Sequence, residues 1–261
     1  MKTLLIDADI TAYQFAARAE KSIDWGDGLW TLHADAEYTI DKITDHVARL
    51  ENLLDADAVV MVLSDPDANF RKDILPSYKS NRKGNRKPVC WAQVRAHLKD
   101  AYKSYEKPTL EGDDVLAILA THPTLIEGEK IVISIDKDFH CVPCNLYRGG
   151  AADEIERITE AEADYFHMVQ TLTGDAVDGY SGCPGIGPKK AEAILTPADD
   201  RQLEGDEYLA WAWQQVVAAY VKAGLGEGEA LVQARCARIL RADDYNFKKK
   251  EPILWSPPSS V

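Results

Sequence analysis

Three short apolar runs, each followed at once by acidic residues, constrain the fold of this chain more than any other feature. They cover residues 3–6 before Asp7, 58–63 before Asp65, and 131–135 before Asp136 and Asp138. Runs this short, rich in Val, Ile and Leu without alternation, are typical of strands buried on both faces of a parallel sheet. Longer segments with helical spacing lie between them, such as residues 34–54 and 115–119. The pattern predicts an α/β fold with a central, mostly parallel sheet flanked by helices.

This arrangement predicts that acidic side chains gather at one place. The carboxyl ends of parallel strands share one edge of a sheet, so the acids that end the three runs are expected to converge there. Two further acidic groups, residues 111–114 and 175–178, lie where helices are expected to start. Asp175 and Asp178 would share one face if their segment is helical. Capping of a helix N-terminus would explain any one of these groups. Five groups on one α/β frame favour a common site.

Carboxylates that lie close together repel one another unless cations lie between them. Oxygen ligands select Mg²⁺, with Mn²⁺ as a substitute, whereas the His and Cys ligands that zinc prefers do not group with these acids. Two such ions about 3.5–4 Å apart would stabilise the attacking and leaving oxygens of a phosphoryl displacement. The sequence therefore predicts a phosphodiesterase that uses two divalent ions.

The charge distribution points to nucleic acid, although the net charge is −13. Residues 71–107 carry eleven basic and three acidic side chains, a local charge of +8, against −21 for the rest of the chain. A concentrated basic segment indicates a partner, whereas net charge does not; a solvated helical face is the alternative. The segment YKSNRKGNRK within it cannot bury itself, so a mobile loop that stacks on and neutralises an unpaired strand is expected. A plain flexible surface loop is the alternative. The expected DNA contacts here are Arg71, Tyr78, Lys79, Arg82, Lys83, Arg86 and Lys87.

A second phosphate-binding segment is predicted at residues 182–191, which read GCPGIGPKKA. Two glycines around an apolar residue, followed by Pro and two lysines, predict a tight turn that opens a helix. The free backbone N–H groups of such a turn, with Lys189 and Lys190, would bind a duplex phosphate without reading the bases. A helical corner with no ligand is the alternative.

The organisation along the chain follows from composition. Residues 1–150 are expected to form the α/β core with the basic loop at about 71–107, residues 151–247 a helical region, and residues 248–261 an extended tail. Five scattered cysteines, an odd number, do not predict a fold held together by disulfide bonds. No leader and no apolar stretch of membrane-spanning length is present in this sequence, so a cytoplasmic monomer is expected.

Five blocks of the sequence resemble the flap endonuclease and 5′→3′ exonuclease family, most closely the stand-alone bacteriophage exonucleases. In the family's order, from Leu4 to Ala191, they are LLIDADITAY, LSDPDANFRKDILPSYKSNR, EGDDVLA, ISIDKDFHCV and GDAVDGYSGCPGIGPKKA. Each block alone is weak, whereas the combined pattern is highly specific. The resemblance implies the PIN-like flap endonuclease fold, with a helix–three-turn–helix DNA-binding region at about residues 170–195.

The resemblance also implies a role for each matching position. The first metal site would be formed by Asp7, Asp65, Glu111, Asp113 and Asp136. The second would be formed by Asp138, Asp175 and Asp178, with Asp114 as an additional carboxylate. Lys79 and Arg82 match the base of the family's arch and would be the catalytic cations at the scissile phosphate. A duplex clamp, where K⁺ can bridge to phosphate, would involve Gly185, Gly187, Lys189 and Lys190.

The implied activity is hydrolysis of DNA from duplex 5′ ends, nicks or flaps in phage replication or recombination, with RNA primers in RNA–DNA hybrids as a compatible substrate. Residues 83–111 are short for the family's threading arch, which favours end-directed action over threading. Two alternatives remain. A non-catalytic duplex-binding module would not need every acidic position filled, as it is here. A ribonuclease on the same scaffold is the other, and the turn at residues 182–191 favours duplex-directed members over it.

Overall fold

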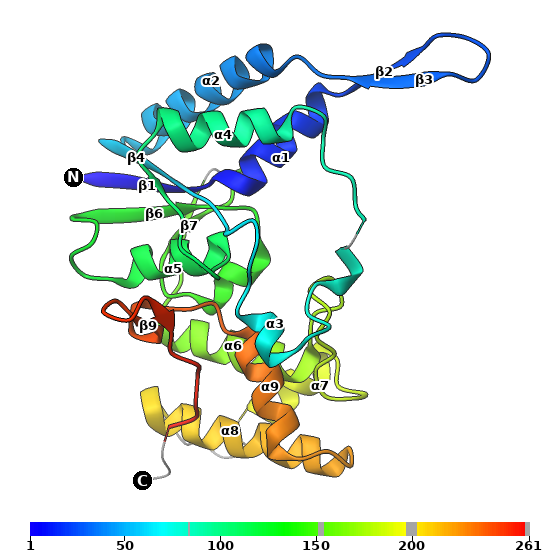
Figure 1. The fold of residues 1–261 in the computed structure, drawn as a ribbon. Helices are drawn as coiled ribbons and strands as arrows, with labels where there is room; N and C mark the ends of the chain where they lie inside the picture. Colours follow the sequence, from blue (N-terminus) through cyan, green and yellow to red (C-terminus); the bar gives the residue numbers. More distant parts are fainter. Residues whose placement is uncertain (83, 151–153, 197–202, 259–261) are drawn as a thin grey trace. The chain divides into compact units, whose positions relative to one another are not determined.

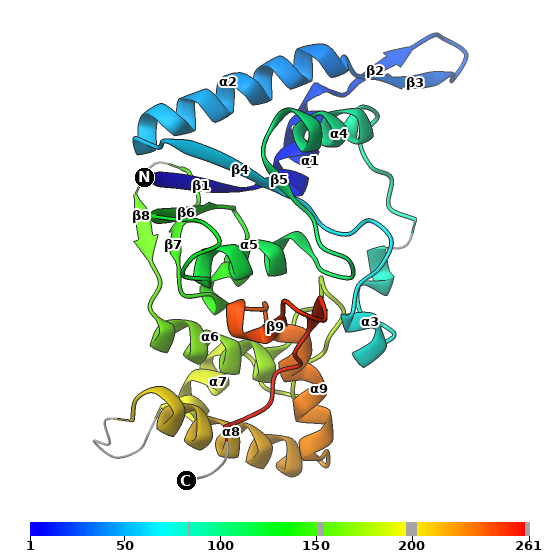
Figure 2. The ribbon, with the colours of Figure 1, turned by 60° about the vertical axis from the view of Figure 1, so that its left-hand side comes forward.

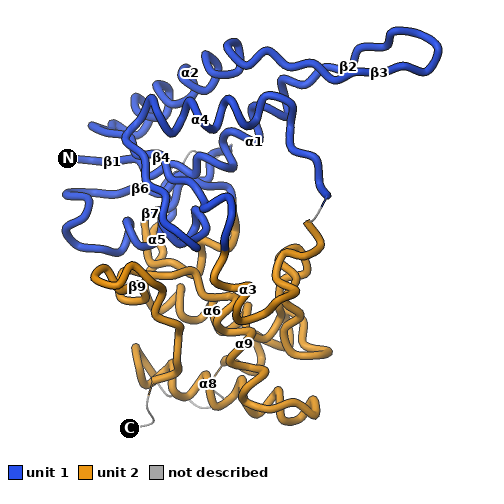
Figure 3. Tube along the Cα trace, viewed as in Figure 1, with its two compact units in different colours: residues 1–68, 84–135, 145–156 blue, residues 69–83, 136–144, 157–261 orange. Residues whose placement is uncertain are grey.

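The computed structural model describes residues 1–82, 84–150, 154–196 and 203–258, so Lys83, a predicted DNA contact, lies outside the described residues. The chain divides into two compact units that interleave along the sequence (Figure 3). Residues 1–68, 84–135 and 145–156 form the first unit, and residues 69–83, 136–144 and 157–261 form the second. The predicted domains were continuous stretches of the sequence, whereas each of these units is formed by three separate segments. The basic segment 71–107 is therefore divided between the two.

The first unit is built on a six-stranded sheet with the order β5-β4-β1-β6-β7-β8. Its strands are β1 (Lys2–Asp7), β4 (Ala58–Val62), β5 (Ser104–Tyr105), β6 (Glu129–Ile133), β7 (Asn145–Tyr147) and β8 (Ile155–Arg157). β1 pairs in parallel with β4 and β6, with Leu5 opposite Val60 on one side and Val132 on the other. The three apolar runs are thus the adjacent central strands, which confirms the predicted parallel sheet.

Helices cover both faces of this sheet because each presents one apolar side. They are α1 (Ala8–Ala19), α2 (Ala36–Leu54), α4 (Trp91–Ala101) and α5 (Gly112–Thr121). In α2 the buried residues Ile43, Val47, Leu50 and Leu54 recur every three or four positions, which places them on one face. Figures 1 and 2 show α1, α2 and α4 on one face of the sheet and α5 on the other. The antiparallel hairpin of β2 (Lys21–Asp24) and β3 (Trp30–His33) projects from this unit.

The second unit is helical. Its α-helices are α3 (Arg71–Ile74), α6 (Glu160–Thr173), α7 (Pro188–Leu195), α8 (Gly205–Lys222) and α9 (Glu227–Ala237). Short 3₁₀ helices cover Ser80–Arg82 (η1), Lys137–Cys141 (η2) and Ala242–Asp244 (η3). α6 packs against α7, α8 and α9 through a core that includes Met168, Leu172 and Tyr220. Among the helices that the structure describes, none is both long and apolar enough to cross a membrane.

The C-terminal segment corrects one expectation. Residues 248–261 were expected to form an extended tail outside the core. β10 (Glu251–Pro252) is extended, but it pairs antiparallel with β9 (Tyr245–Asn246). Trp255 is only 7% exposed, and its ring centroid lies 5.2 Å from that of Trp213. Burial of a large apolar side chain contributes about 1.5–3 kcal/mol, which holds this extended segment against the helices of the unit. Residues 251–255 therefore belong to the folded unit.

Candidate active site

Asp7 ends β1 in the first unit, as the sequence predicts. Its Oδ1 accepts a 3.0 Å hydrogen bond from the backbone N–H of Ile10, so the same carboxylate caps α1. The hydroxyl of Ser134, which follows β6, lies 3.4 Å from Asp7 Oδ2. Asp7 is 4% exposed. A buried carboxylate at the carboxyl ends of β1 and β6 is the geometry that the strand-end prediction requires.

Asp65 and the start of α5 lie together in the same unit. The backbone N–H of Asp65 donates to Leu110 O at 2.9 Å, and Asp65 Oδ2 accepts from Thr109 N at 2.7 Å. Backbone N–H groups of Asp67 and Thr109 lower the pKa of Asp65, which keeps it ionised. Glu111, the next residue after Leu110, is the N-cap of α5.

The acids at the start of α5 divide into two kinds. Asp114 is fully buried and forms a capping box with Glu111, since Asp114 Oδ2 accepts from Glu111 N at 3.2 Å. Asp113 and Glu111 are half-buried. Asp114 therefore has a structural task at the helix start, whereas Glu111 and Asp113 keep part of their surface in solvent.

Four acidic side chains interact electrostatically in the second unit, namely Asp136, Asp138, Asp175 and Asp178. Asp136 caps η2, with Oδ1 accepting from Asp138 N at 2.9 Å. Burial, followed by the charges of Asp136 and Asp175, raises the pKa of Asp138 to about 6. Asp178 also contributes to this rise, whereas the charge of Lys137 opposes it. An Asp whose pKa is raised by burial and by neighbouring acids is costly to ionise, and a divalent cation would relieve that cost.

The segment that carries Asp175 and Asp178 is a closed turn, so the predicted sharing of a helical face is wrong. Asp175 N donates to Tyr180 O at 2.8 Å, and Asp175 Oδ1 accepts from the N–H groups of Val177 and Asp178. Although burial opposes it, these two N–H groups and Lys137 lower the pKa of Asp175. Gly174 and Gly182, both at positive φ, let the two ends of the segment approach closely. The backbone closes a turn here because the glycines permit it.

Lys79 and Arg82, the predicted catalytic cations, both contact Asp178. Lys79 Nζ lies 3.3 Å from Asp178 Oδ2, and Arg82 Nη2 donates to Asp178 Oδ1. Lys79 N also donates to Asp178 O at 2.8 Å, which joins the two segments through the backbone. The structure thus brings the predicted cations next to a predicted metal ligand, although they lie about a hundred residues apart in sequence.

Two predicted DNA contacts need correction. Tyr78 is 3% exposed and its hydroxyl donates to Asp178 Oδ2 at 3.0 Å, so its ring cannot stack on an unpaired strand. Arg71 is also 3% exposed, and its guanidinium donates to the carbonyls of Cys236 and Arg238. Both side chains anchor their segment inside the second unit. Composition alone predicted a mobile loop because it does not reveal these distant partners.

The rest of the basic segment is partly neutralised within the first unit. Arg86 forms a bidentate pair with Glu20, at 2.6 and 2.7 Å. Arg95 pairs with Asp9 at 2.7 Å and with Glu106 at 3.2 Å. Lys87 Nζ lies 3.6 Å from the centroid of the Trp91 ring and remains exposed. The net positive charge that this segment can offer to DNA is therefore smaller than its count of basic residues suggested.

The turn at residues 182–191 has the predicted form, since α7 begins at Pro188 directly after Gly187. Gly185 has a φ of +75° with open space around it, and Lys190 Nζ donates to Gly185 O at 2.8 Å. Lys189 is exposed. α7 packs on α6, so the turn joins two helices in contact.

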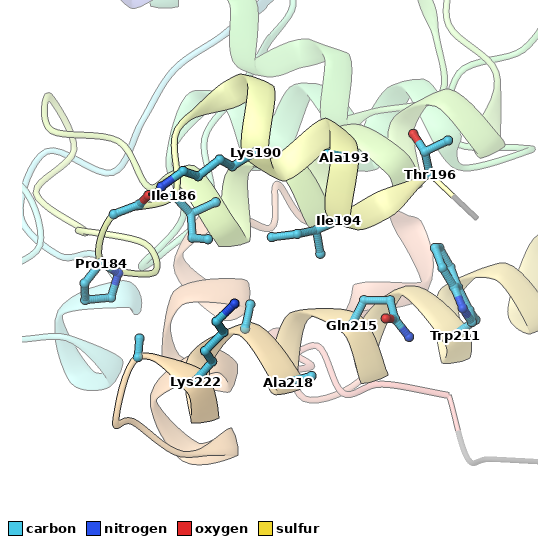
Figure 4. Close-up of a pocket in the computed structure, with 13 residues that line it drawn as sticks. Pro184, Ile186, Lys190, Ala193, Ile194, Thr196, Trp211, Gln215, Ala218 and Lys222 are labelled. Carbon is cyan, nitrogen blue, oxygen red and sulfur yellow. Dashed lines mark hydrogen bonds between the residues drawn. The ribbon is translucent and has the colours of Figure 1, made fainter. Parts of the chain in front are cut away.

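A cavity of about 940 Å³ lies between this turn, α7 and α8 (Figure 4). Ile186 and Ile194 point toward α8, and Trp211 lines the opposite wall. Lys190 and Lys222 also line it, but no acidic residue does among those described. This groove therefore lacks the groups that phosphodiester hydrolysis needs.

The nine predicted metal-binding carboxylates fall into two sets, five in the first unit and four in the second. Within the described parts of the chain, no three Asp, Glu, His or Cys side chains are grouped closely enough to hold an ion together. Their oxygens accept from backbone N–H groups and from Lys and Arg side chains instead. The assignment of these carboxylates as ligands stays a prediction.

Gln170 was not predicted from sequence. It is 5% exposed in α6, and its Nε2 donates to Asp138 Oδ1 at 2.6 Å. The thiol of Cys141 donates to Gln170 Oε1 at 2.9 Å. Burial raises the pKa of Cys141, so the thiol keeps the proton that it donates. A single Gln in a helix carries no sequence signal for such a contact.

Residues 2–164 match the family model described as the 5′-3′ exonuclease N-terminal resolvase-like domain. The exodeoxyribonuclease of Enterobacteria phage T3 is 31% identical over 98% of this chain and 93% of its own length. The exonuclease of Escherichia phage T7 is 31% identical over 97% of this chain and 93% of its own length. The flap endonuclease Xni of Shewanella oneidensis is 27% identical over 62% of this chain and 66% of its own length.

Solved structures of bacteriophage T5 proteins share the fold. The T5 D15 flap endonuclease, in a complex with DNA and metal ions, matches with a TM-score of 0.57 at 16% identity, over 90% of this chain and 91% of that one. The T5 5′-exonuclease with bound zinc matches with a TM-score of 0.58 at 15% identity, over the same shares. The central parallel sheet flanked by helices is the fold of these nucleases. This chain is therefore a nuclease of the 5′→3′ exonuclease and flap endonuclease family.

Proposed function

We propose that the protein hydrolyses DNA phosphodiesters from duplex 5′ ends, nicks or flaps with the help of two Mg²⁺ ions, for which Mn²⁺ substitutes. The observation that carries the proposal is the group of acids around Asp138, where Asp138 N donates to Asp136 Oδ1 at 2.9 Å. Burial and the charges of Asp136, Asp175 and Asp178 raise the pKa of Asp138, although Lys137 opposes the rise. An all-oxygen donor set fits hard divalent cations. The T5 structures with metal ions and with DNA support the same chemistry by analogy.

In this proposal the carboxylates act in two groups. The first ion would be held by Asp7, Asp65, Glu111, Asp113 and Asp136. The second would be held by Asp138, Asp175 and Asp178, with Asp114 supporting from inside α5. The ions, when bound, supply Lewis-acid stabilisation of the charge that develops on the phosphate oxygens.

Lys79 and Arg82 would neutralise the same phosphate. Both now contact Asp178, and an anionic oxygen close to that carboxylate would find their N–H groups within reach. Arg82 has a side chain that is 47% exposed, so its guanidinium is accessible to a DNA strand. The exposed Lys87, Lys189 and Lys190 and the exposed Arg86 would contact the DNA backbone, with Gly185 and Gly187 shaping the turn that can also accept K⁺.

Finer points also belong to the proposal. The similarity to nucleases of phages T3 and T7 fits a role in phage DNA replication or recombination. The protein is expected to act as a monomer in the host cytoplasm. The same hydrolysis is proposed to act on RNA–DNA hybrids, where it would remove RNA primers. A preference for strand ends over threaded flaps is expected because residues 83–111 are short for an arch.

The test is digestion of 5′-labelled duplex, nicked, flapped and RNA–DNA hybrid substrates, in Mg²⁺ and in EDTA. Asp138→Asn and Asp178→Asn should reduce cleavage to background while duplex binding is retained. Asp41→Asn removes an exposed carboxylate from the middle of α2 and serves as the matched control. Wild-type cleavage by either site variant in Mg²⁺ would show that the two-ion assignment is wrong. Products of one or two nucleotides would identify an end-directed exonuclease, and the hybrid lane tests primer removal.

A further inference from the structure

A polar pocket in the first unit is lined on one side by Asp7, and its other lining residues have no role in the proposed chemistry. It has a volume of about 360 Å³, and its walls come from α1, α2 and the segments that follow β6 and β7. It therefore lies at the carboxyl ends of β1, β6 and β7, the edge of a parallel sheet where ligands commonly bind. Pockets for small ligands usually measure roughly 300–1,000 Å³. The pocket is large enough for a nucleotide-sized group.

The charge of this pocket is positive in an acidic protein. Arg18, Arg49 and Arg148 line it, and Asp7 is the single acid among the lining residues. None of the three arginines forms an ion pair with a carboxylate that the structure describes. Other arginines, such as Arg86 and Arg95, are paired. Because acids outnumber bases 43 to 30, three arginines without such partners in one pocket indicate an anionic ligand.

The neighbouring groups leave the guanidinium N–H donors available. Arg148 uses one N–H group, which donates to Ile135 O at 3.0 Å. The guanidinium of Arg18 lies 5.8 Å from the centroid of the Phe15 ring, which in turn contacts His46. Burial, followed by the charges of Arg49 and Arg18, lowers the pKa of His46, so the imidazole is neutral at pH 7. The positive charge of the pocket therefore comes from the three arginines, each with five N–H donors.

We propose that this pocket binds the 5′-phosphate monoester of a nucleotide, either at the end of the DNA strand being degraded or on the mononucleotide that is released. Guanidinium groups match the geometry of a phosphate and bind it through paired N–H donors. A phosphate monoester carries more charge than a backbone phosphodiester, so three arginines select the strand end. The inference rests on the proposed function, because Asp7 is one of the carboxylates assigned to the reaction there.

Binding of a nucleotide to the pocket can be measured without DNA cleavage. Thymidine 5′-monophosphate is titrated into the full-length protein in EDTA, so that no divalent ion mediates binding, and thymidine is the uncharged control. Arg18→Gln and Arg49→Gln should each weaken binding of the monophosphate by about tenfold, the usual worth of a charged hydrogen bond. Lys42→Gln is the matched control, since it removes one positive charge from α2 at a position outside the pocket. Thermal midpoints close to that of the wild type establish that the variants are folded.

Cleavage rates then distinguish the two sources of the phosphate. Duplexes with a 5′-phosphate or a 5′-hydroxyl are digested in Mg²⁺, and the ratio of the two rates is compared between proteins. A ratio above one that falls toward one in Arg18→Gln and Arg49→Gln assigns the pocket to the strand end. Arginine-dependent binding of the monophosphate with a rate ratio of one assigns it to the released product. If neither binding nor the ratio depends on the arginines, the inference is overturned. A protein that binds the monophosphate through these arginines but cleaves no DNA would retain the pocket and refute the proposed function.

Discussion

The side-chain amide of Gln170 donates a 2.6 Å hydrogen bond to Oδ1 of Asp138. Gln170 lies in α6 and Asp138 in η2, and both belong to the second unit. The amide is itself held by the thiol of Cys141. Asp138 is therefore oriented by a neutral donor, which adds no positive charge beside it.

Removal of this donor should weaken metal binding more than folding. Gln170→Leu is expected to raise the Mg²⁺ concentration for half-maximal cleavage by about 10–100-fold, the usual effect of losing a group that orients a metal ligand. Cys141→Ser keeps a donor to Gln170 and should have a smaller effect than Cys141→Ala. Calorimetric titration with Mn²⁺ measures the affinity directly. An unchanged affinity in Gln170→Leu would mean that the amide only fills space.

Loss of Lys79 or Arg82 should reduce the rate more than the stability. Lys79→Ala and Arg82→Ala are each expected to lower kcat by about 10²-fold, as for other groups that stabilise transition-state charge. Exposed ion pairs contribute about 0–1 kcal/mol, so the thermal midpoint of Arg82→Ala should change little. Lys72→Ala, an exposed lysine in α3, is the control. A rate loss that merely follows thermal destabilisation would support a plain surface loop.

Gly182→Ala should destabilise the turn that carries Asp175 and Asp178. Gly182 has a φ of +65°, and an added Cβ would collide with backbone atoms of Gly174 and Thr173. We expect a loss of at least about 2 kcal/mol, from the clash and the strained backbone together. Gly185→Ala is the matched control, because its φ is +75° but no atom lies within 4 Å of the added Cβ. It should cost only about 1–2 kcal/mol. Thermal unfolding followed by circular dichroism measures both, and equal losses would refute the close-approach argument.

His167 should make the protein less stable in acid. Its Nε2 lies 2.8 Å from Ala234 O and therefore donates, while Nδ1 is buried with no hydrogen-bond partner among the described residues. Burial, followed by the charge of Arg238, lowers the pKa of His167 well below its usual value near 6.5.

The difference in the pKa of His167 between the folded and unfolded chain makes the stability depend on pH. Below pH about 6.5 the unfolded chain binds a proton at His167 that the folded chain does not, so stability falls by up to about 1.4 kcal/mol per pH unit. Thermal midpoints of the wild type and His167→Gln are compared between pH 7.5 and pH 5.5, where shared carboxylates contribute equally to both. The wild type should lose more stability on acidification. An equal loss in both proteins would place the acid sensitivity elsewhere.

The strands and their terminal acids could be predicted because they depend on local pattern. Unbroken apolar runs such as residues 58–63 need burial on both faces, and a parallel sheet provides it. Asp7 and Asp65 follow such strands, so their place at one sheet edge follows from connectivity. The turn before α7 was predictable for the same reason, since Gly187 and Pro188 determine the backbone locally.

The roles of Arg71 and Tyr78 could not be predicted, because their partners lie far away in sequence. Arg71 donates to carbonyls 165 and 167 residues further along the chain, and Tyr78 donates to a residue 100 positions away. Composition marks both side chains as exposed loop residues, whereas burial depends on which segments pack together. The same holds for Gln170, whose partner lies 32 residues earlier.

The sequence by itself determined the parallel sheet, the acids at the ends of its strands and the family to which the chain belongs. Apolar periodicity, turn residues and strand-end chemistry are properties of neighbouring residues, so they can be read along the chain. Only the tertiary structure decided which cations face Asp178, which amide orients Asp138, and which arginines line the pocket beside Asp7. These relationships join segments that folding brings together, and the free energy that selects them comes from burial and charge in three dimensions.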